Sequence, residues 1–135
     1  MGVNFWYYCS TKEAVLEAGY KALDALAEVD GICTPFDICS AGSKVETNYP
    51  EIGPTTNHPY CPSLKDKIGD ESKVEDGVNY IPEIVIDALT LENAEESLKK
   101  GIEALNGVDG VIKVSAGNYG GDLGKYKFHL KDVLD

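Results

Sequence analysis

The sequence has few basic residues for its length. Lysine and arginine together number 12 against 23 aspartates and glutamates, which gives a net charge of −11 over 135 residues. Nucleic acids and anionic membranes attract positively charged surfaces, so this balance argues against both as partners. In a chain of single-domain length, high acidity is more typical of a soluble protein or of a salt-rich cytosol than of an acidic reaction mechanism.

Metal-binding spacings are also missing. The four cysteines, Cys9, Cys33, Cys39 and Cys61, form no C-x-x-C pair, which argues against a zinc site. Cys9 and Cys33 lie in apolar, strand-like runs, so we expect buried free thiols and a reducing compartment. The sequence opens without a charged-then-apolar leader and has no apolar run of membrane-spanning length. We therefore expect a cytoplasmic protein.

The first half of the sequence predicts a strand, a helix and a second strand. The aromatic, apolar run 3–9 has the composition of a strand. The segment Ser10–Glu13 has the spacing of a capping box, which predicts the start of a helix over 11–29. Asp30-Gly31 ends that helix, and Ile32-Cys33 begins the next strand. The predicted helix has one apolar stripe, made of Val15, Ala18, Ala22, Leu26 and Val29.

The second half repeats this plan at an offset of 79 residues. The run Ile84–Leu89 corresponds to Phe5–Ser10, and a second helix is predicted over 91–106. Val29-Asp30-Gly31 recurs as Val108-Asp109-Gly110. The strands that follow end alike, once an insertion of four residues in the first copy is allowed for. Because neither copy can bury its helix stripe alone, the two copies must share one core.

A doubled βαβ unit predicts an α+β fold, the ferredoxin-like sandwich, in which an antiparallel sheet carries two helices on one face. A parallel doubly wound sheet is the alternative, although two helical patterns are few for at least five strand-like runs. The whole chain, 1–135, is expected to form one domain with two additions. One is a long irregular loop over 46–80, and the other is a C-terminal hairpin of 111–116, a glycine-rich turn through Gly124, and a strand over 126–130.

Glu83 is the candidate for acid–base chemistry. It precedes Ile84-Val85-Ile86, and a carboxyl group among branched apolar residues can be desolvated, which suits it to proton transfer. Its equivalent in the first copy is Asn4, so the scaffold itself does not require an acid there. The alternative is an exposed glutamate at a strand end.

The other candidates are weaker. His58 and Cys61, three residues apart, make half of a metal site without another half. The glycines over 117–124 lack the G-x-G-x-x-G spacing of a dinucleotide site, and a flexible turn is the simpler interpretation. Lys44, after Ala41-Gly42-Ser43, could hold an anion or be a solvated lysine.

Three motifs together resemble one family. They are Asn57-His58-Pro59-Tyr60-Cys61-Pro62, Glu83-Ile84-Val85-Ile86, and Ser115-Ala116-Gly117-Asn118-Tyr119-Gly120-Gly121 followed by Leu123-Gly124-Lys125-Tyr126. The family is formylmethanofuran:tetrahydromethanopterin formyltransferase of methanogenic archaea and some relatives and methylotrophs. The resemblance runs from Asn4-Phe5 to about Asp132. It is to the C-terminal, distal lobe alone, one of two lobes of similar α+β type.

The resemblance implies formyl transfer from methanofuran to tetrahydromethanopterin, both as substrates, with no metal or permanently bound cofactor. The family's catalytic glutamate precedes the Ile-Val-Ile strand, which is Glu83 here, although Pro82 stands where members commonly have an aromatic residue. Oxyanion donors would come from backbone N–H groups near Asn118 or the long loop. The expected substrate-binding residues are Lys44, Asn57, His58, Tyr60 and Asn118.

The resemblance also implies a homo-oligomer, and a separate N-terminal lobe is a further expected partner. An aromatic first strand and a glycine-rich hairpin suggest uncovered apolar surface. Three interpretations stay open: one subunit of a split enzyme, a stand-alone relative that binds a pterin-like ligand without turnover, or an excised lobe. A non-catalytic pterin-binding or oligomerisation module is thus the alternative to the enzyme.

Overall fold

The computed structural model describes residues 1–41, 51, 58–116 and 129–134. In chain order its main elements are β1 (Gly2–Cys9), α1 (Lys12–Leu26), β2 (Ile32–Cys33), β3 (Cys39–Ser40), α2 (Lys65–Ile68), β4 (Pro82–Ala88), α3 (Leu91–Glu103), β5 (Val111–Ser115) and α4 (Leu130–Leu134). No helix in these ranges is long and apolar enough to cross a membrane.

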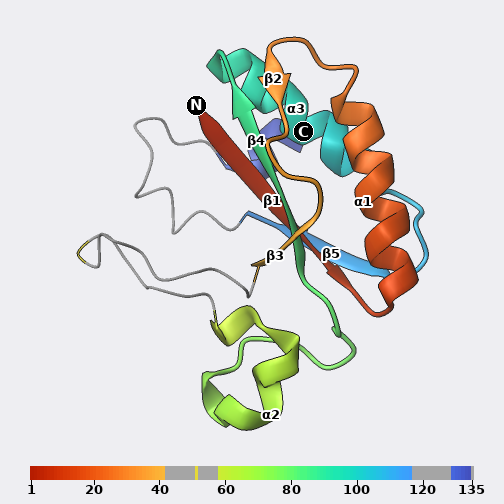
Figure 1. Ribbon diagram of the computed structural model, residues 1–135, viewed down its shortest axis with the longest axis vertical. Coiled ribbons are helices and arrows are strands. Elements are labelled where there is room, and N and C mark those ends of the chain that lie inside the picture. The colour runs from red at the N-terminus through yellow and green to blue at the C-terminus, as the bar shows by residue number, and fades with distance from the viewer. Residues whose placement is uncertain (42–50, 52–57, 117–128, 135) are drawn as a thin grey trace.

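The sheet is antiparallel in every described pairing. Its order is β2-β4-β1-β5, and β3 also pairs with β4. The helices α1 and α3 pack on each other and on the central strands, and β1 and β4 run side by side through the molecule (Figure 1). The ferredoxin-like prediction is therefore confirmed. The parallel alternative is wrong, because α1 and α3 each connect two strands that are not neighbours in the sheet, and the strands that are neighbours run antiparallel.

The 79-residue repeat appears as a symmetric register. Phe5 and Ile84 are equivalent positions in the two copies, and they are also Cα partners in the β1–β4 ladder. The pairs Asn4↔Val85 and Trp6↔Glu83 then flank this centre symmetrically. The four-residue insertion in the first copy accounts for a further difference: the strand equivalent to β5 is split into β2 and β3.

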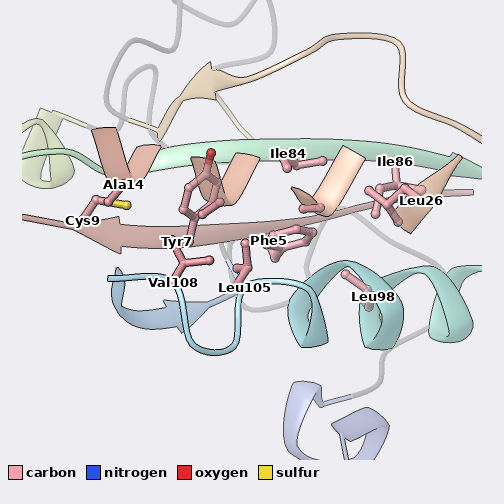
Figure 2. Close-up of a cluster of buried hydrophobic side chains, with 12 residues drawn as sticks. Phe5, Tyr7, Cys9, Ala14, Leu26, Ile84, Ile86, Leu98, Leu105 and Val108 are labelled. Carbon is pink, nitrogen blue, oxygen red and sulfur yellow. The ribbon is translucent and has the colours of Figure 1, made fainter. Parts of the chain in front are cut away.

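The main core lies between the sheet and the two helices. Phe5, Tyr7, Ile84 and Ile86 from the strands meet α1 and α3 there, and Figure 2 shows the side chains that these elements contribute. Both helices approach the sheet closely through small residues. A Cβ on Gly19 of α1 would lie 2.5 Å from the Tyr7 hydroxyl oxygen. The large aromatic residues of β1 therefore fit because glycine and alanine line the helices.

Two local expectations are corrected. The cap of α1 is Thr11, whose hydroxyl accepts from the Ala14 N–H at 3.1 Å, while the Ser10 hydroxyl turns to the Gly110 carbonyl. Cys33 is exposed because the two-residue β2 lies at the edge of the sheet, although Cys9 is buried as expected. All four thiols are free.

The two additions are described only in part. The predicted irregular loop contains consecutive short helical turns over 58–71, because Pro59 and Pro62 have the fixed φ of such turns. Residues 126–128 of the predicted second hairpin arm lie outside the described residues, and Leu130 begins α4 rather than ending a strand. Leu130 and Val133, three residues apart, both pack against the main core, which favours a helical turn.

Candidate functional site

The face of the sheet opposite the helices carries the candidate site. Side chains alternate between faces along a strand, so Phe5 and Tyr7 enter the main core while Asn4, Trp6 and Tyr8 lie on the other face. On β4, Ile84 and Ile86 enter the core. Glu83, the cross-strand partner of Trp6, therefore lies on the same face as Trp6.

The Glu83 carboxylate is held by two donors from β1. The Asn4 side-chain amide donates to Oε2 at 3.2 Å, and the Trp6 indole N–H donates to the same oxygen. Glu83 is half-buried, and no described basic residue forms an ion pair with it. Glu83 is therefore not fully exposed, although it lies at the start of β4 as the alternative interpretation has it.

A second apolar cluster surrounds Trp6 on this face. It is formed by residues of β1 and of the segment between the two copies: Trp6, Tyr8, Ala41, Val74, Val78 and Ile81, with Tyr60 packed against them. The Tyr60 ring meets the indole edge-on, with centroids 4.9 Å apart. Lys73 Nζ lies 5.7 Å from the centre of the Tyr60 ring. The segment between the copies thus covers part of the sheet face beside Glu83.

Tyr8 extends the polar part of this face toward β5. Its hydroxyl is 3.0 Å from the Ser115 hydroxyl. Lys113 Nζ lies 4.6 Å from the centre of the Tyr8 ring and forms an ion pair with Glu75. The hydrogen bond to Glu75 raises the pKa of Lys113, so this cation stays charged. It ties the segment between the two copies to β5.

Cys39 is the cross-strand neighbour of Glu83 on its other side. The two residues are Cα partners in the β3–β4 ladder, so their side chains share a face. Burial raises the pKa of the Cys39 thiol, and the Glu83 and Asp37 carboxylates add to the effect. A raised pKa favours the protonated thiol over the nucleophilic thiolate.

The structure describes two of the five predicted substrate-binding residues, His58 and Tyr60. Tyr60 is brought to the site through its contact with Trp6. His58 opens the short turn that carries Tyr60, and its Nε2 is 3.0 Å from an exposed Glu71 oxygen. Lys44, Asn57 and Asn118 lie outside the described residues. Within the described ranges, no group of histidine, cysteine or acidic residues could hold a metal ion.

Asn4, Trp6, Tyr8 and Ser115 belong to the site although the motifs did not single them out for it. Period-two alternation along 3–9 places Asn4, Trp6 and Tyr8 on one face, and the repeat equates Asn4 with Glu83. The hydrogen bonds themselves depend on strand register, which the sequence does not state. A shallow hollow between α3 and α4 is lined mainly by charged side chains and lies on the helix side of the sheet, so it is separate from this site.

The chain is similar to full-length proteins from methanogens. It is 63% identical over 134 residues to a formylmethanofuran–tetrahydromethanopterin formyltransferase-like protein of Methanothermobacter thermautotrophicus, covering 99% of this chain and 45% of that protein. It is 42% identical over 139 residues to the formylmethanofuran–tetrahydromethanopterin formyltransferase of Methanocaldococcus jannaschii, covering 99% of this chain and 46% of that protein. The chain thus spans about half the length of the curated relatives it matches.

Solved structures agree with this similarity. The formylmethanofuran:tetrahydromethanopterin formyltransferase of Methanosarcina barkeri superposes with a TM-score of 0.83 at 42% identity, over 96% of this chain and 44% of that one. The formyltransferase/hydrolase complex of Methylorubrum extorquens, solved with methylofuran, superposes with a TM-score of 0.82 at 32% identity, over 98% and 44%.

The family model that matches covers residues 1–133 and describes the proximal lobe of the formyltransferase, which corrects the expected distal lobe. Over those residues the chain belongs to the formylmethanofuran:tetrahydromethanopterin formyltransferase family, as its C-terminal lobe.

Proposed function

We propose that this chain is the C-terminal lobe of an enzyme that transfers a formyl group from formylmethanofuran to tetrahydromethanopterin, in the one-carbon metabolism of methanogenesis. The observation that carries the proposal is the position of Glu83. Its carboxylate is half-buried and held by Asn4 and Trp6, in a lobe shared with relatives named for this reaction.

The chemistry suits a single carboxyl group. The attacking pterin nitrogen forms a bond to the formyl carbon, and a tetrahedral intermediate with an oxyanion results. The bond from that carbon to the methanofuran nitrogen then breaks. The proton released by the attacking nitrogen must reach the leaving nitrogen, and Glu83 takes it from the first and gives it to the second. The reaction consumes no oxidant or reductant, and we propose no permanently bound cofactor.

The substrate-binding residues form a second part of the proposal. Tyr60 and His58 lie on the short turns that cover the sheet face near Glu83, which supports a role in holding a ring of the substrate. Lys44, Asn57 and Asn118 are proposed as further substrate-binding residues. Backbone N–H groups near Asn118 are the proposed oxyanion donors.

We further propose a cytoplasmic homo-oligomer, with a separate N-terminal lobe as an additional partner. Four free thiols support a reducing compartment. The first strand is not the uncovered surface we expected, since Trp6, Tyr7 and Tyr8 are at most 4% exposed. Leu16 and Tyr20, one turn apart on α1, are 45% and 53% exposed and support association instead. A monomer by light scattering at micromolar concentration would contradict it.

A non-catalytic pterin-binding or oligomerisation module is the second candidate. One observation favours it: relatives that are 54–63% identical carry names ending in "formyltransferase-like protein", whereas those at 42–47% are named as the formyltransferase itself. In such a module Glu83 would contribute to affinity alone.

Replacement of Glu83 by glutamine separates the two candidates. This chain is mixed with formylmethanofuran and tetrahydromethanopterin, with and without a separately expressed N-terminal lobe, and the formylated pterin is followed. Because the amide keeps the shape but cannot shuttle a proton, Glu83→Gln should lower turnover at least ~100-fold with binding little changed. We expect the lobe alone to be inactive or nearly so.

The matched control is Asp87→Asn, because Asp87 is exposed on the same strand and face. It should leave turnover unchanged. Full activity of Glu83→Gln would remove Glu83 from the mechanism. Tight pterin binding without turnover in any mixture would favour the module.

A further inference from the structure

Two hydrogen-bond donors converge on one oxygen of Glu83. The Asn4 amide and the Trp6 indole N–H both donate to Oε2. Both donors come from β1, which lies directly beside β4, and Trp6 is the Cα partner of Glu83. A carboxylate has about four acceptor sites, two on each oxygen. The two donors therefore occupy the capacity of Oε2.

The Trp6 donor has little freedom to move. The side chain is 4% exposed, and the indole packs among Tyr8, Val74 and Val78 with Tyr60 against it. A close-packed ring cannot turn without opening a void, so the direction of its N–H is set by the cluster. An indole nitrogen only donates, and a carboxylate is the acceptor it meets here. The orientation of the Glu83 carboxyl is thus set by the packing of its neighbours.

The other oxygen of Glu83 has no hydrogen-bond partner within the ranges that the structure describes. A proton shuttle needs an oxygen that is accessible to the reacting nitrogens, and an oxygen saturated by two fixed donors is poorly suited to accept a third proton. The two oxygens are therefore unequal before any substrate arrives.

Resting on the proposed function, we propose that Trp6 and Asn4 are positioning residues that hold Oε2 and so present Oε1 as the oxygen that takes and returns the proton. The proton passes from the attacking nitrogen to Oε1 and from Oε1 to the leaving nitrogen, while both hydrogen bonds to Oε2 persist. The competing explanation is that Glu83 merely satisfies a partly buried indole N–H, in which case the pair stabilises the fold and does not affect the reaction.

The arrangement can be tested without turnover, because the chain has one tryptophan. Nuclear magnetic resonance of the 15N-labelled chain gives a single indole resonance. A charged acceptor makes a stronger hydrogen bond than an amide, so Glu83→Gln should move the indole proton upfield and speed its exchange with water. Asp87→Asn should leave the resonance in place. An indole resonance that Glu83→Gln does not move would overturn the proposed hydrogen bond and the positioning role.

Kinetics then separate positioning from folding. Trp6→Phe keeps an aromatic ring and loses the donor, and Asn4→Leu keeps the size and loses the donor. In the mixture with the N-terminal lobe, each should lower kcat about tenfold with KM unchanged, because a misoriented acid loses reaction rate rather than substrate affinity. Asn4→Gln retains an amide donor and should recover part of the loss. Circular dichroism checks that each variant is folded.

A double-mutant cycle gives the decisive readout. If Trp6 acts through Glu83, then Trp6→Phe should have no further effect on turnover when Glu83 is already glutamine. Equal effects of Trp6→Phe in both backgrounds would identify a structural role and overturn the proposal. Unchanged kcat in Trp6→Phe and Asn4→Leu would overturn it too while leaving Glu83 in the mechanism. Full activity of Glu83→Gln, or no turnover in any mixture, would contradict the proposed reaction at Glu83. The proposed role of Oε1 would then fail with it.

Discussion

Asn4 and Glu83 occupy the same position in the two copies of the repeat, 79 residues apart, and are joined by a hydrogen bond of 3.2 Å. They meet because β1 and β4 pair antiparallel about Phe5 and Ile84, which are themselves equivalent. Two equivalent residues one step from this centre must lie diagonally across it, on the same face. One copy therefore contributes the acid, and the other contributes the amide that holds it.

Two glycines with positive φ, Gly110 after α3 and Gly77 in the segment between the two copies, should tolerate alanine unequally. Gly110 has φ of 92°, and a Cβ there would lie 2.8 Å from the Ala14 Cβ. Gly77 has φ of 88° in open space. Gly77→Ala should cost the backbone strain alone, roughly 1–2 kcal/mol. Gly110→Ala should cost more, as measured by urea unfolding. Equal losses would contradict the close contact with α1.

The N-terminus of α1 should depend on Thr11 rather than Ser10. The Thr11 hydroxyl accepts from the Ala14 N–H, whereas Ser10 makes a weak contact of 3.4 Å to the Gly110 carbonyl. Thr11→Ala should lower the free energy of unfolding by about 1 kcal/mol. Ser10→Ala should change it by about 0.5 kcal/mol or less. A larger loss for Ser10→Ala in thermal unfolding would restore the capping box that the sequence suggested.

The stability of the fold should decline at alkaline pH through Cys9. Burial raises the pKa of this thiol to about 11, whereas an unfolded thiol ionises near about 8.5. The unfolded state therefore loses its proton first. The contribution is complete below the unfolded pKa and is lost as pH rises through the folded one, on the order of 3 kcal/mol in all. Burial also raises the pKa of Tyr7, which acts in the same direction at higher pH.

Urea unfolding across this range measures the slope. Cys9→Ala should flatten the dependence between about pH 8.5 and pH 10, where Tyr7 contributes little. Cys33→Ser is the control, because Cys33 is exposed and its replacement should leave the slope unchanged. A slope that persists in Cys9→Ala would assign the effect to another group.

Several features of the fold could be predicted because they depend on local patterns. The helix stripe that includes Ala18, Ala22 and Leu26 is buried as its period indicated, and both helices and the central strands lie close to their predicted ranges. The repeat indicated one shared core, and Gly31 and Gly110 each adopt a positive φ after a helix. The identification of Glu83 rested on the family resemblance, with its apolar strand context in support.

The expectations that failed involved contacts between distant segments. Alternating residues predicted that a strand would end at Leu130, yet Leu130 enters α4 because it and Val133 reach the main core, while residues 126–128 of that strand lie outside the described ranges. Cys33 lies in an apolar run, yet the edge of the sheet exposes it. The aromatic residues Trp6 and Tyr8 were expected at an uncovered surface, yet the segment between the two copies covers them.

The sequence alone determined the doubled βαβ plan, since hydrophobic period and turn residues act over a few positions and a repeat makes the two halves explain each other. Only the tertiary structure decided the environment of Glu83. Which face of β4 is covered, which residue of β1 lies opposite, and which oxygen receives the two donors all depend on strand register, where a shift of one residue would turn every side chain to the other face.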